Sequence, residues 1–151
     1  MRRMIRTWAA GCVLAGGLLA GAAAVADPGF SDKPHKMVIQ VDSADPALQN
    51  LALNNAVNLQ KLRGMDDVAI EVVAYGPGLT MLLKNPKNKL AARVNSLALQ
   101  DISFSACGNT MAKMEKKTGK KLTLLAGAHK VTAGVGRILD LEEHGYAYLR
   151  P

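Results

Sequence analysis

The sequence contains two cysteines, and only one of them is placed where thiol chemistry is favoured. Cys107 follows the apolar run Ile102-Ser103-Phe104-Ser105-Ala106, which predicts a strand, and precedes Gly108-Asn109-Thr110, which begins a predicted helix. The thiolate is the nucleophile of sulfur chemistry, and a helix N-terminus favours it because free backbone N–H groups and the positive end of the dipole face the sulfur. The spacing therefore predicts a reactive thiol at residue 107.

A second interpretation of Cys107 stays open at this point. Free cysteine is among the most buried residue types, so the side chain could simply end a strand as a small apolar group. The position directly after a strand, with Lys113 further along the predicted helix, favours the reactive thiol. Asp42 or Asp101 would oppose the thiolate if the fold brought either carboxylate close.

Three loops directly follow predicted strands and share a place in the expected fold. They are residues 42–45, 75–78 and 107–110. Ligands of parallel α/β sheets bind outside the carboxyl ends of the strands, so we expect these loops to line a pocket around the cysteine. The candidate lining residues are Asp42, Ser43, Gly76, Pro77, Gly78, Gly108, Asn109 and Thr110. Simpler roles are open for each of them, as helix caps or turn residues.

The elements that must position this pocket alternate along the chain. Apolar and β-branched runs predict strands at residues 37–41, 68–74, 102–106, 122–125 and 146–149. Helical patterns lie between them, at residues 46–63, 79–83, 90–97, from Asn109 or Thr110 to Lys117, and from Thr132 to Gly145. The alternation predicts a three-layer α/β/α sandwich with a mostly parallel sheet of about five strands.

The longest predicted helix has a clear start signal and an apolar pattern. Asp45 is the expected cap, and Pro46 occupies the first helical position, where its missing N–H costs nothing. Leucines and one alanine follow at helical spacing, so we expect a single buried face formed by Leu48, Leu51, Ala52, Leu59 and Leu62.

The N-terminal residues have the pattern of a secretory signal peptide. Three arginines precede an uncharged apolar stretch over residues 8–25, which ends in Ala24-Val25-Ala26. The competing interpretation is a retained membrane anchor, but the stretch is mostly alanine and glycine. We expect cleavage of residues 1–26, leaving no membrane anchor and placing the mature chain in a bacterial periplasm. Cys12 would be lost. Residues 27–35 are then a flexible lead-in, and residues 36–151 form one domain.

Composition excludes several function classes. Aromatic residues make up 4% of the chain, which is too few for a stacking platform, so nucleic acid is not an expected partner. Neither a phosphate-binding loop nor a dinucleotide fingerprint follows a predicted strand. The three histidines share no metal-ligand spacing with Cys107, so we expect neither a metal nor another cofactor. A basic cluster forms either a solvated helix end or a surface for an acidic partner: Lys113, Lys116, Lys117, Lys120 and Lys121.

Three segments of the sequence resemble the DsrE/DsrF-like sulfur-relay family, which includes the YchN-like group. They are Val73-Ala74-Tyr75-Gly76-Pro77-Gly78-Leu79, Phe104-Ser105-Ala106-Cys107-Gly108-Asn109-Thr110 and the ending over residues 143–151, and the resemblance covers about residues 36–151. It implies an α/β/α domain, frequent homo-oligomerisation, and a cysteine that in some members carries persulfide sulfur between proteins and that corresponds to Cys107. The sequence departs from characterised relays by its export signal and by the lack of a second mature cysteine.

Two functions follow from these observations, and the sequence leaves open whether either is enzymatic. In the first, the exported protein is a thiol or persulfide sulfur carrier that uses Cys107 and exchanges sulfur with a protein donor or acceptor. In the second, it is a non-catalytic ligand-binding or assembly module with the same fold and a structural cysteine.

Overall fold

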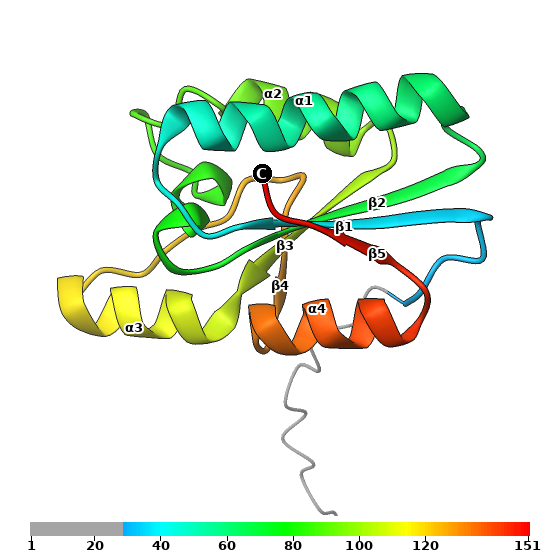
Figure 1. Cartoon of the computed structure of the whole chain (residues 1–151). Coiled ribbons are helices and arrows are strands. Elements are labelled where there is room, and N and C mark those ends of the chain that lie inside the picture. The colour runs from blue at the N-terminus through cyan, green and yellow to red at the C-terminus, as the bar shows by residue number, and fades with distance from the viewer. Residues whose placement is uncertain (1–28) are drawn as a thin grey trace, which may run out of the picture.

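The computed structural model describes residues 29–151, which form one five-stranded, fully parallel sheet between two layers of helices. The strand order is β4-β3-β2-β1-β5. The strands are β1 (His35–Val41), β2 (Val68–Ala74), β3 (Ile102–Cys107), β4 (His129–Val131) and β5 (Ala147–Leu149). Helices α1 (Pro46–Arg63) and α2 (Ala91–Ala98) cover one face, and α3 (Gly108–Thr118) and α4 (Gly134–Glu143) lie on the other (Figure 1). The predicted three-layer α/β/α architecture is confirmed.

The central strands are buried on both faces, as a parallel sheet covered by helices requires. All seven residues of β2 are buried. The apolar side chains form two clusters, one on each face of the sheet. The larger, which includes Leu53 and Phe104, lies toward α1 and α2, and the smaller, which includes Val73 and Leu141, lies toward α4.

The strand register brings the predicted loops to one edge of the sheet. Val41 pairs with Ala74, and Ala74 pairs with Ala106, the residue before Cys107. The carboxyl ends of β1, β2 and β3 therefore lie side by side. The loops that follow them emerge together, as the sequence predicted.

Helix α1 begins as predicted but buries a different face. The Asp45 side chain accepts a hydrogen bond from the Ala47 N–H at 2.8 Å, and the helix ends before Gly64, whose φ is +91°. The buried residues are Gln49, Ala52, Leu53 and Ala56. Of the predicted face only Ala52 is buried, and Leu48, Leu51 and Leu62 are exposed. Small alanines let the helix approach the sheet, so the leucines lie outside the contact.

The predicted strand at residues 122–125 is wrong. This segment forms an isolated antiparallel bridge between Leu124 and Leu83, and Leu125 donates its N–H to the Leu82 carbonyl at 2.9 Å. This segment therefore pairs with Leu82 and Leu83 instead of entering the sheet. The fourth strand is His129–Val131, whose short His-Lys-Val sequence gave no apolar signal.

Two other predictions need correction. Residues 79–82 belong to a 3₁₀ helix, η1 (Gly76–Leu82), that also contains the Gly76-Pro77-Gly78 turn, and Leu83 follows it. Helix α4 begins at Gly134, two residues after the predicted start at Thr132, and ends at Glu143.

The predicted signal peptide lies outside the described residues. The segment just before β1 contacts the domain: the Ser31 N–H donates to the Tyr146 hydroxyl at 3.4 Å, and Arg137 donates to the Gly29 carbonyl at 3.1 Å. Over residues 29–151, no helix combines the length and apolar character needed to cross a membrane.

Candidate functional site at the carboxyl ends of the strands

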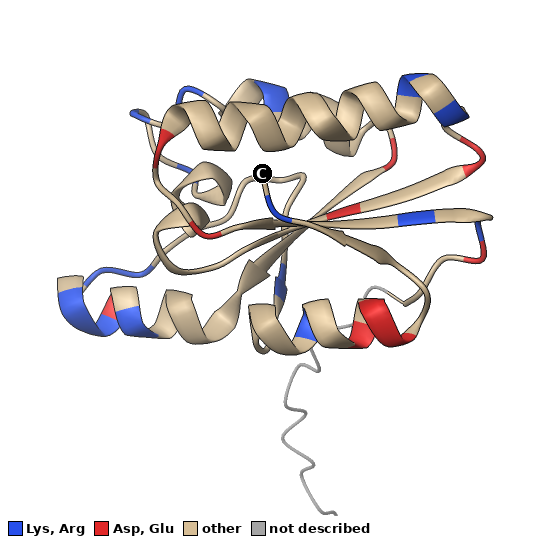
Figure 2. Cartoon of the chain, in the orientation of Figure 1, with Lys and Arg blue, Asp and Glu red and all other residues tan. Residues whose placement is uncertain are grey.

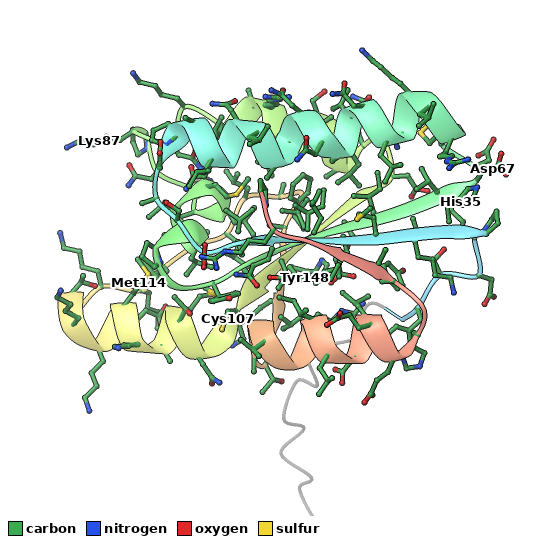
Figure 3. All side chains as sticks on the ribbon, in the orientation of Figure 1. His35, Asp67, Lys87, Cys107, Met114 and Tyr148 are labelled. Carbon is green, nitrogen blue, oxygen red and sulfur yellow. The ribbon has the colours of Figure 1, made fainter. Side chains whose placement is uncertain are left out.

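Cys107 is both the last residue of β3 and the residue that precedes α3. The helix begins at Gly108, so Asn109 and Thr110 lie inside its first turn and neither is the N-cap that the sequence predicted. Figure 3 shows Cys107 where α3 meets the sheet. Its side chain is buried, at 6% exposure, and it is the free cysteine of the described residues.

The surroundings of the sulfur favour its thiolate form. Burial by itself raises the pKa of the Cys107 thiol, but hydrogen bonds from the Thr110 hydroxyl and from the backbone N–H groups of Gly134, Thr110 and Asn109 outweigh it. The net effect is a pKa below the usual value. These donors come from two helix N-termini, those of α3 and α4, whose dipoles both stabilise an anion at the sulfur.

Gly134 brings the second helix to the sulfur, and the sequence analysis did not select it. A Cβ atom at this position would lie 3.2 Å from the Cβ of Cys107 and 3.1 Å from the Cβ of Tyr75. Only a residue without a side chain lets the start of α4 come this close. Gly134-Val135-Gly136 lies inside a predicted helical pattern and matches no nucleotide-binding motif, so nothing in the sequence selected Gly134.

Gly108 allows a second close approach. A Cβ at Gly108 would lie 2.9 Å from the Val131 carbonyl oxygen, and the Asn109 N–H donates to the Thr132 carbonyl at 3.2 Å. The segment between β4 and α4 is thereby held against the start of α3. The missing side chain of Gly108 thus makes room for another segment of the same chain.

Thr110 connects the cysteine with the loop that follows β2. Its hydroxyl oxygen accepts a hydrogen bond from the Gly76 N–H at 3.0 Å, and the hydroxyl also bonds the sulfur of Cys107. Gly76 has a φ of +51°, which favours glycine. Gly78 lies under the end of β1, where a Cβ would be 2.2 Å from the Val41 carbonyl oxygen, and Pro77 is exposed. Within the Gly76-Pro77-Gly78 turn, Gly76 is therefore the residue that hydrogen-bonds to Thr110 beside the thiol.

Tyr75 contacts the same site from the end of β2. Burial, and then the charge of Asp42, raise the pKa of the Tyr75 hydroxyl, with smaller contributions that include Tyr148 and Cys107. The phenol therefore stays protonated at neutral pH. Tyr75 was part of a predicted loop but was not selected as a site residue.

Asp42 lies in a network that connects three segments of the chain. Its carboxylate accepts hydrogen bonds from Arg150 at 2.8 Å and from Gln40 at 3.1 Å, and the Tyr148 hydroxyl donates to Gln40 at 2.5 Å. The Asp42 charge is thus paired with a cation. Tyr148 and Arg150 come from β5 and the residue after it; they lie in the ending that resembles the family, but they were not selected as site residues.

Ser43 and Asp101, two residues considered from the sequence, do not face the thiol. The Ser43 hydroxyl accepts from the Asp45 N–H at 3.1 Å and shapes the start of α1. Asp101 precedes β3, at the opposite end of that strand from Cys107, and pairs with Lys33 at 2.5 Å. Asp42 and Asp101, the two carboxylates that could have disfavoured the thiolate, are thus each paired with a cation.

A second polar cluster lies buried beside the sheet. Glu71 receives two hydrogen bonds from Arg137, at 2.8 and 2.9 Å, and accepts a third from the Ser105 hydroxyl. The Ser105 oxygen is also 2.8 Å from Nε2 of His129. The chain of contacts joins β2, β3, β4 and α4 in a buried hydrogen-bonded row.

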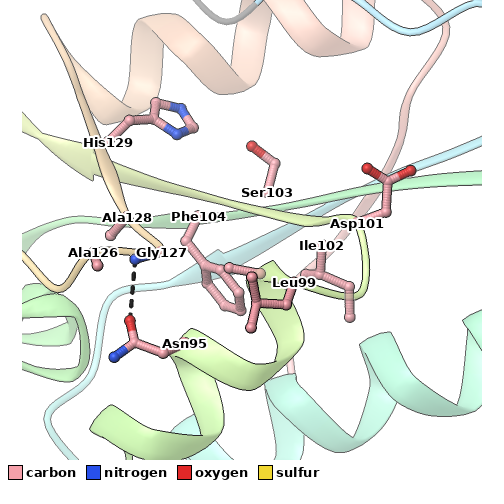
Figure 4. Close-up of a pocket in the computed structure, with 11 residues that line it drawn as sticks. Asn95, Leu99, Asp101, Ile102, Ser103, Phe104, Ala126, Gly127, Ala128 and His129 are labelled. Carbon is pink, nitrogen blue, oxygen red and sulfur yellow. Dashed lines mark hydrogen bonds between the residues drawn. The ribbon is translucent and has the colours of Figure 1, made fainter.

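His129 also lines a cavity of about 630 Å³ near the amino end of β3 (Figure 4). Ser103 and Asp101 line it near the start of the strand. Asn95 of α2 also lines it, and its side-chain oxygen accepts a hydrogen bond from the Gly127 N–H at 3.0 Å. Cys107 does not line this cavity. In the chain from residue 29 onward, no group of three or more His, Cys, Asp or Glu side chains is placed to hold a metal ion.

Comparison with known proteins supports the resemblance seen in the sequence. A structure titled as a protein of unknown function, MTH1491 from Methanobacterium thermoautotrophicum, is 32% identical, with a TM-score of 0.68 over 78% of this chain and 99% of the other. The ychN protein from E. coli shares the fold at 15% identity, with a TM-score of 0.62 and the same coverage of both chains. No curated protein matches. The model of the DsrE/DsrF-like family matches residues 35–151, and the chain belongs to that family.

Proposed function

We propose that this protein is an exported sulfur carrier that holds a sulfane sulfur as a persulfide on Cys107 and exchanges it with another protein. The observation that carries the proposal is the position of Cys107 between the N-termini of α3 and α4, whose hydrogen-bond donors lower the pKa of the thiol. Membership of the DsrE/DsrF-like family, whose fold is of the sulfur-relay type, supports it.

The proposed transfer is a thiol exchange with no net oxidation. The Cys107 thiolate attacks the outer sulfur of a donor persulfide, the donor S–S bond breaks, and the donor leaves as a thiolate while a new S–S bond forms on Cys107. In the second step an acceptor thiolate attacks the outer sulfur, and Cys107 leaves. A low pKa helps both steps, because the same thiolate is first the nucleophile and then the leaving group.

The sulfur environment also suits the loaded state. A persulfide is an anion at neutral pH, and the N–H groups that lower the pKa of the Cys107 thiol would favour an anion bound to this sulfur as well. From residue 29 onward no second cysteine is present to form an internal disulfide with the loaded thiol. Release of the sulfur therefore requires an external thiol, which makes a carrier the function that fits this site.

Intact-mass spectrometry after exposure to glutathione persulfide tests the proposal. We expect the protein to gain one sulfur atom, the adduct to disappear on addition of a thiol reductant, and Cys107→Ser to gain nothing. A native protein that gains no sulfur from this donor or from inorganic polysulfide would refute the carrier function and leave a binding or assembly module.

The export part of the proposal has its own measurement. Cleavage after Ala26 would leave Asp27 as the first residue of the mature chain. We expect the intact mass of protein recovered from a periplasmic fraction to match that start. Protein that retains Cys12 and remains with the cytoplasmic fraction would contradict export.

A further inference from the structure

Lysine side chains gather at the end of the molecule where the strands have their carboxyl ends. Lys116, Lys117, Lys120 and Lys121 lie in the last turn of α3 and in the segment after it. Lys84 and Lys87 lie in the loop that follows η1. We call these six residues the lysine face. Figure 2 shows basic residues at the far end of α3 and in the nearby loops, and Figure 3 shows Lys87 and Met114 of α3 at this same end.

Backbone contacts bring the two parts of the lysine face together. The Lys84 N–H donates to the Thr123 carbonyl at 2.7 Å, and the neighbouring Leu83 forms the bridge with Leu124. Thr123 lies two residues after Lys121. Residues more than thirty positions apart in the sequence therefore share one surface, which the sequence cluster by itself did not reveal.

The charges of the lysine face are not neutralised within residues 29–151. All six lysines are exposed, and none of them forms an ion pair with a described residue. The nearby Glu115 carboxylate is engaged by the Leu122 N–H at 2.8 Å. The helix dipole explains cations in the last turn of α3, namely Lys116 and Lys117, but its effect ends within that turn and does not reach Lys84 or Lys87.

The lysine face is close enough to the thiol for one bound protein to contact both. Lys116 is nine residues after Cys107 along α3, a distance of about 13 Å at the rise of an α-helix. A specific protein interface buries about 800 Å² on each partner, which is roughly 30 Å across. A protein seated on the lysine face can therefore reach the start of α3, where Cys107 is recessed and only 6% exposed.

We propose that the lysine face is the docking surface for an acidic protein that delivers sulfur to Cys107 or removes it. The inference deepens the proposed function by naming the chemical class of its partner. The recessed thiol requires a partner that presents its own sulfur on a projecting segment, and the unpaired lysines select one whose segment is flanked by Asp and Glu. Complementary charge also speeds the encounter, which matters for a carrier that must meet two partners in turn.

Disulfide exchange with synthetic peptides tests the proposal on the mature protein. The probe is a short Glu-rich peptide whose single cysteine is activated as a disulfide with 2-pyridinethiol, and its control has Gln in place of each Glu. The Cys107 thiolate attacks the peptide sulfur, a peptide–protein disulfide forms, and 2-pyridinethione leaves and is followed by absorbance. We expect the acidic peptide to react about tenfold faster at low salt, and this advantage to vanish at high salt.

A matched pair of charge reversals locates the docking surface. Lys116→Glu/Lys117→Glu changes the last turn of α3, and Lys61→Glu/Arg63→Glu changes the last turn of α1, so both remove two cations from the end of a helix. We expect the first variant to lose the acidic peptide's advantage and the second to keep it. Both should react unchanged with 2,2′-dipyridyl disulfide, a small neutral reagent that reports the thiol alone.

The outcomes separate this proposal from the carrier function. Equal rates for the two peptides, with a thiol that reacts with the small reagent, would overturn docking, and so would an equal loss in both variants.

If the small reagent does not react, the carrier function fails, and docking is decided by fluorescence anisotropy of a cysteine-free Glu-rich peptide. Salt-dependent binding lost in Lys116→Glu/Lys117→Glu supports docking, and no binding overturns it. Binding to phosphatidylglycerol vesicles but not to the peptide would assign the face to a membrane and overturn the proposal.

Discussion

The Thr110 hydroxyl joins Cys107 to the loop after β2, because it bonds the sulfur and at the same time accepts the Gly76 N–H at 3.0 Å. Thr110→Val keeps the shape and removes this donor. A hydrogen bond to a charged group contributes about 1.5 to 3 kcal/mol, so we expect its loss to raise the pKa of the thiol. The measurement is the pH dependence of alkylation by iodoacetamide, whose midpoint should move to higher pH.

Two further variants complete this test. Thr110→Ser keeps the hydroxyl and should restore the midpoint of the native protein. Thr118→Val removes a hydroxyl at the other end of α3, where it donates to the Met114 carbonyl at 2.8 Å, and should leave the midpoint unchanged. The same midpoint in Thr110→Val and in the native protein would show that the hydroxyl does not stabilise the thiolate.

Gly134 and Gly136 provide a matched pair in the first turn of α4. A methyl group at Gly134 would press against Cys107 and Tyr75 at 3.2 and 3.1 Å, so Gly134→Ala should lower the free energy of unfolding by about 1 to 3 kcal/mol. A methyl group at Gly136 would meet the Ala133 Cβ at an ordinary 3.7 Å, so Gly136→Ala should be neutral or stabilising by up to about 1 kcal/mol. Urea denaturation measures both, and equal stability of the two variants would contradict the close approach of α4.

The buried ion pair between Arg137 and Glu71 should be costly to break from one side. Arg137→Met leaves the Glu71 carboxylate buried without its cation, so we expect the free energy of unfolding to fall by about 3 to 5 kcal/mol. Arg93→Met is the control, because Arg93 bonds only the neutral side chains of Asn50 and Asn54 and should cost less than about 1.5 kcal/mol. Equal urea midpoints for these two variants would argue against a structural role for the pair.

We expect the mature protein to be a homo-oligomer. Large apolar side chains are exposed on both helical layers, among them Leu62 of α1 at 74% and Val135 of α4 at 64%. The two edge strands of the sheet, β4 and β5, are also only three residues long. Burying such surfaces against a second copy removes apolar area from water. Light scattering at micromolar concentration measures the mass, and a stable monomer would refute this expectation.

The sequence predicts the sheet well because most of its strands are buried on both sides. Runs such as residues 68–74 have no alternative to a buried strand, and the cysteine loop follows the third of them. The prediction failed at β4 and on α1. His129-Lys130-Val131 joins the sheet by pairing with β3, and its own sequence does not indicate a strand. On α1 the leucine spacing suggested the buried face, but Ala52 and Ala56 lie on the face that contacts the sheet.

The structure brings the predicted Cys107, Gly76 and Thr110 together, and it adds residues that were not selected from the sequence. The loop after β3 was identified because a cysteine there precedes a helix. Gly134, Tyr148 and Arg150 approach the site from elements far along the chain, and their places depend on the strand order β4-β3-β2-β1-β5. Long-range pairing of this kind leaves no local pattern. Gly134 acts through the absence of a side chain, which spacing rules do not detect.

The pairing of β1 with β5 has a consequence for how the sheet is completed. Met37, Val38 and Ile39 of β1 pair with Ala147, Tyr148 and Leu149, more than a hundred residues later. Contacts of such separation form slowly. A chain that has emerged only as far as α4 leaves this side of β1 open, and an uncovered apolar strand edge is a site for pairing with other chains. Pairing with β5 therefore covers an apolar edge of β1 that would otherwise be open to other chains.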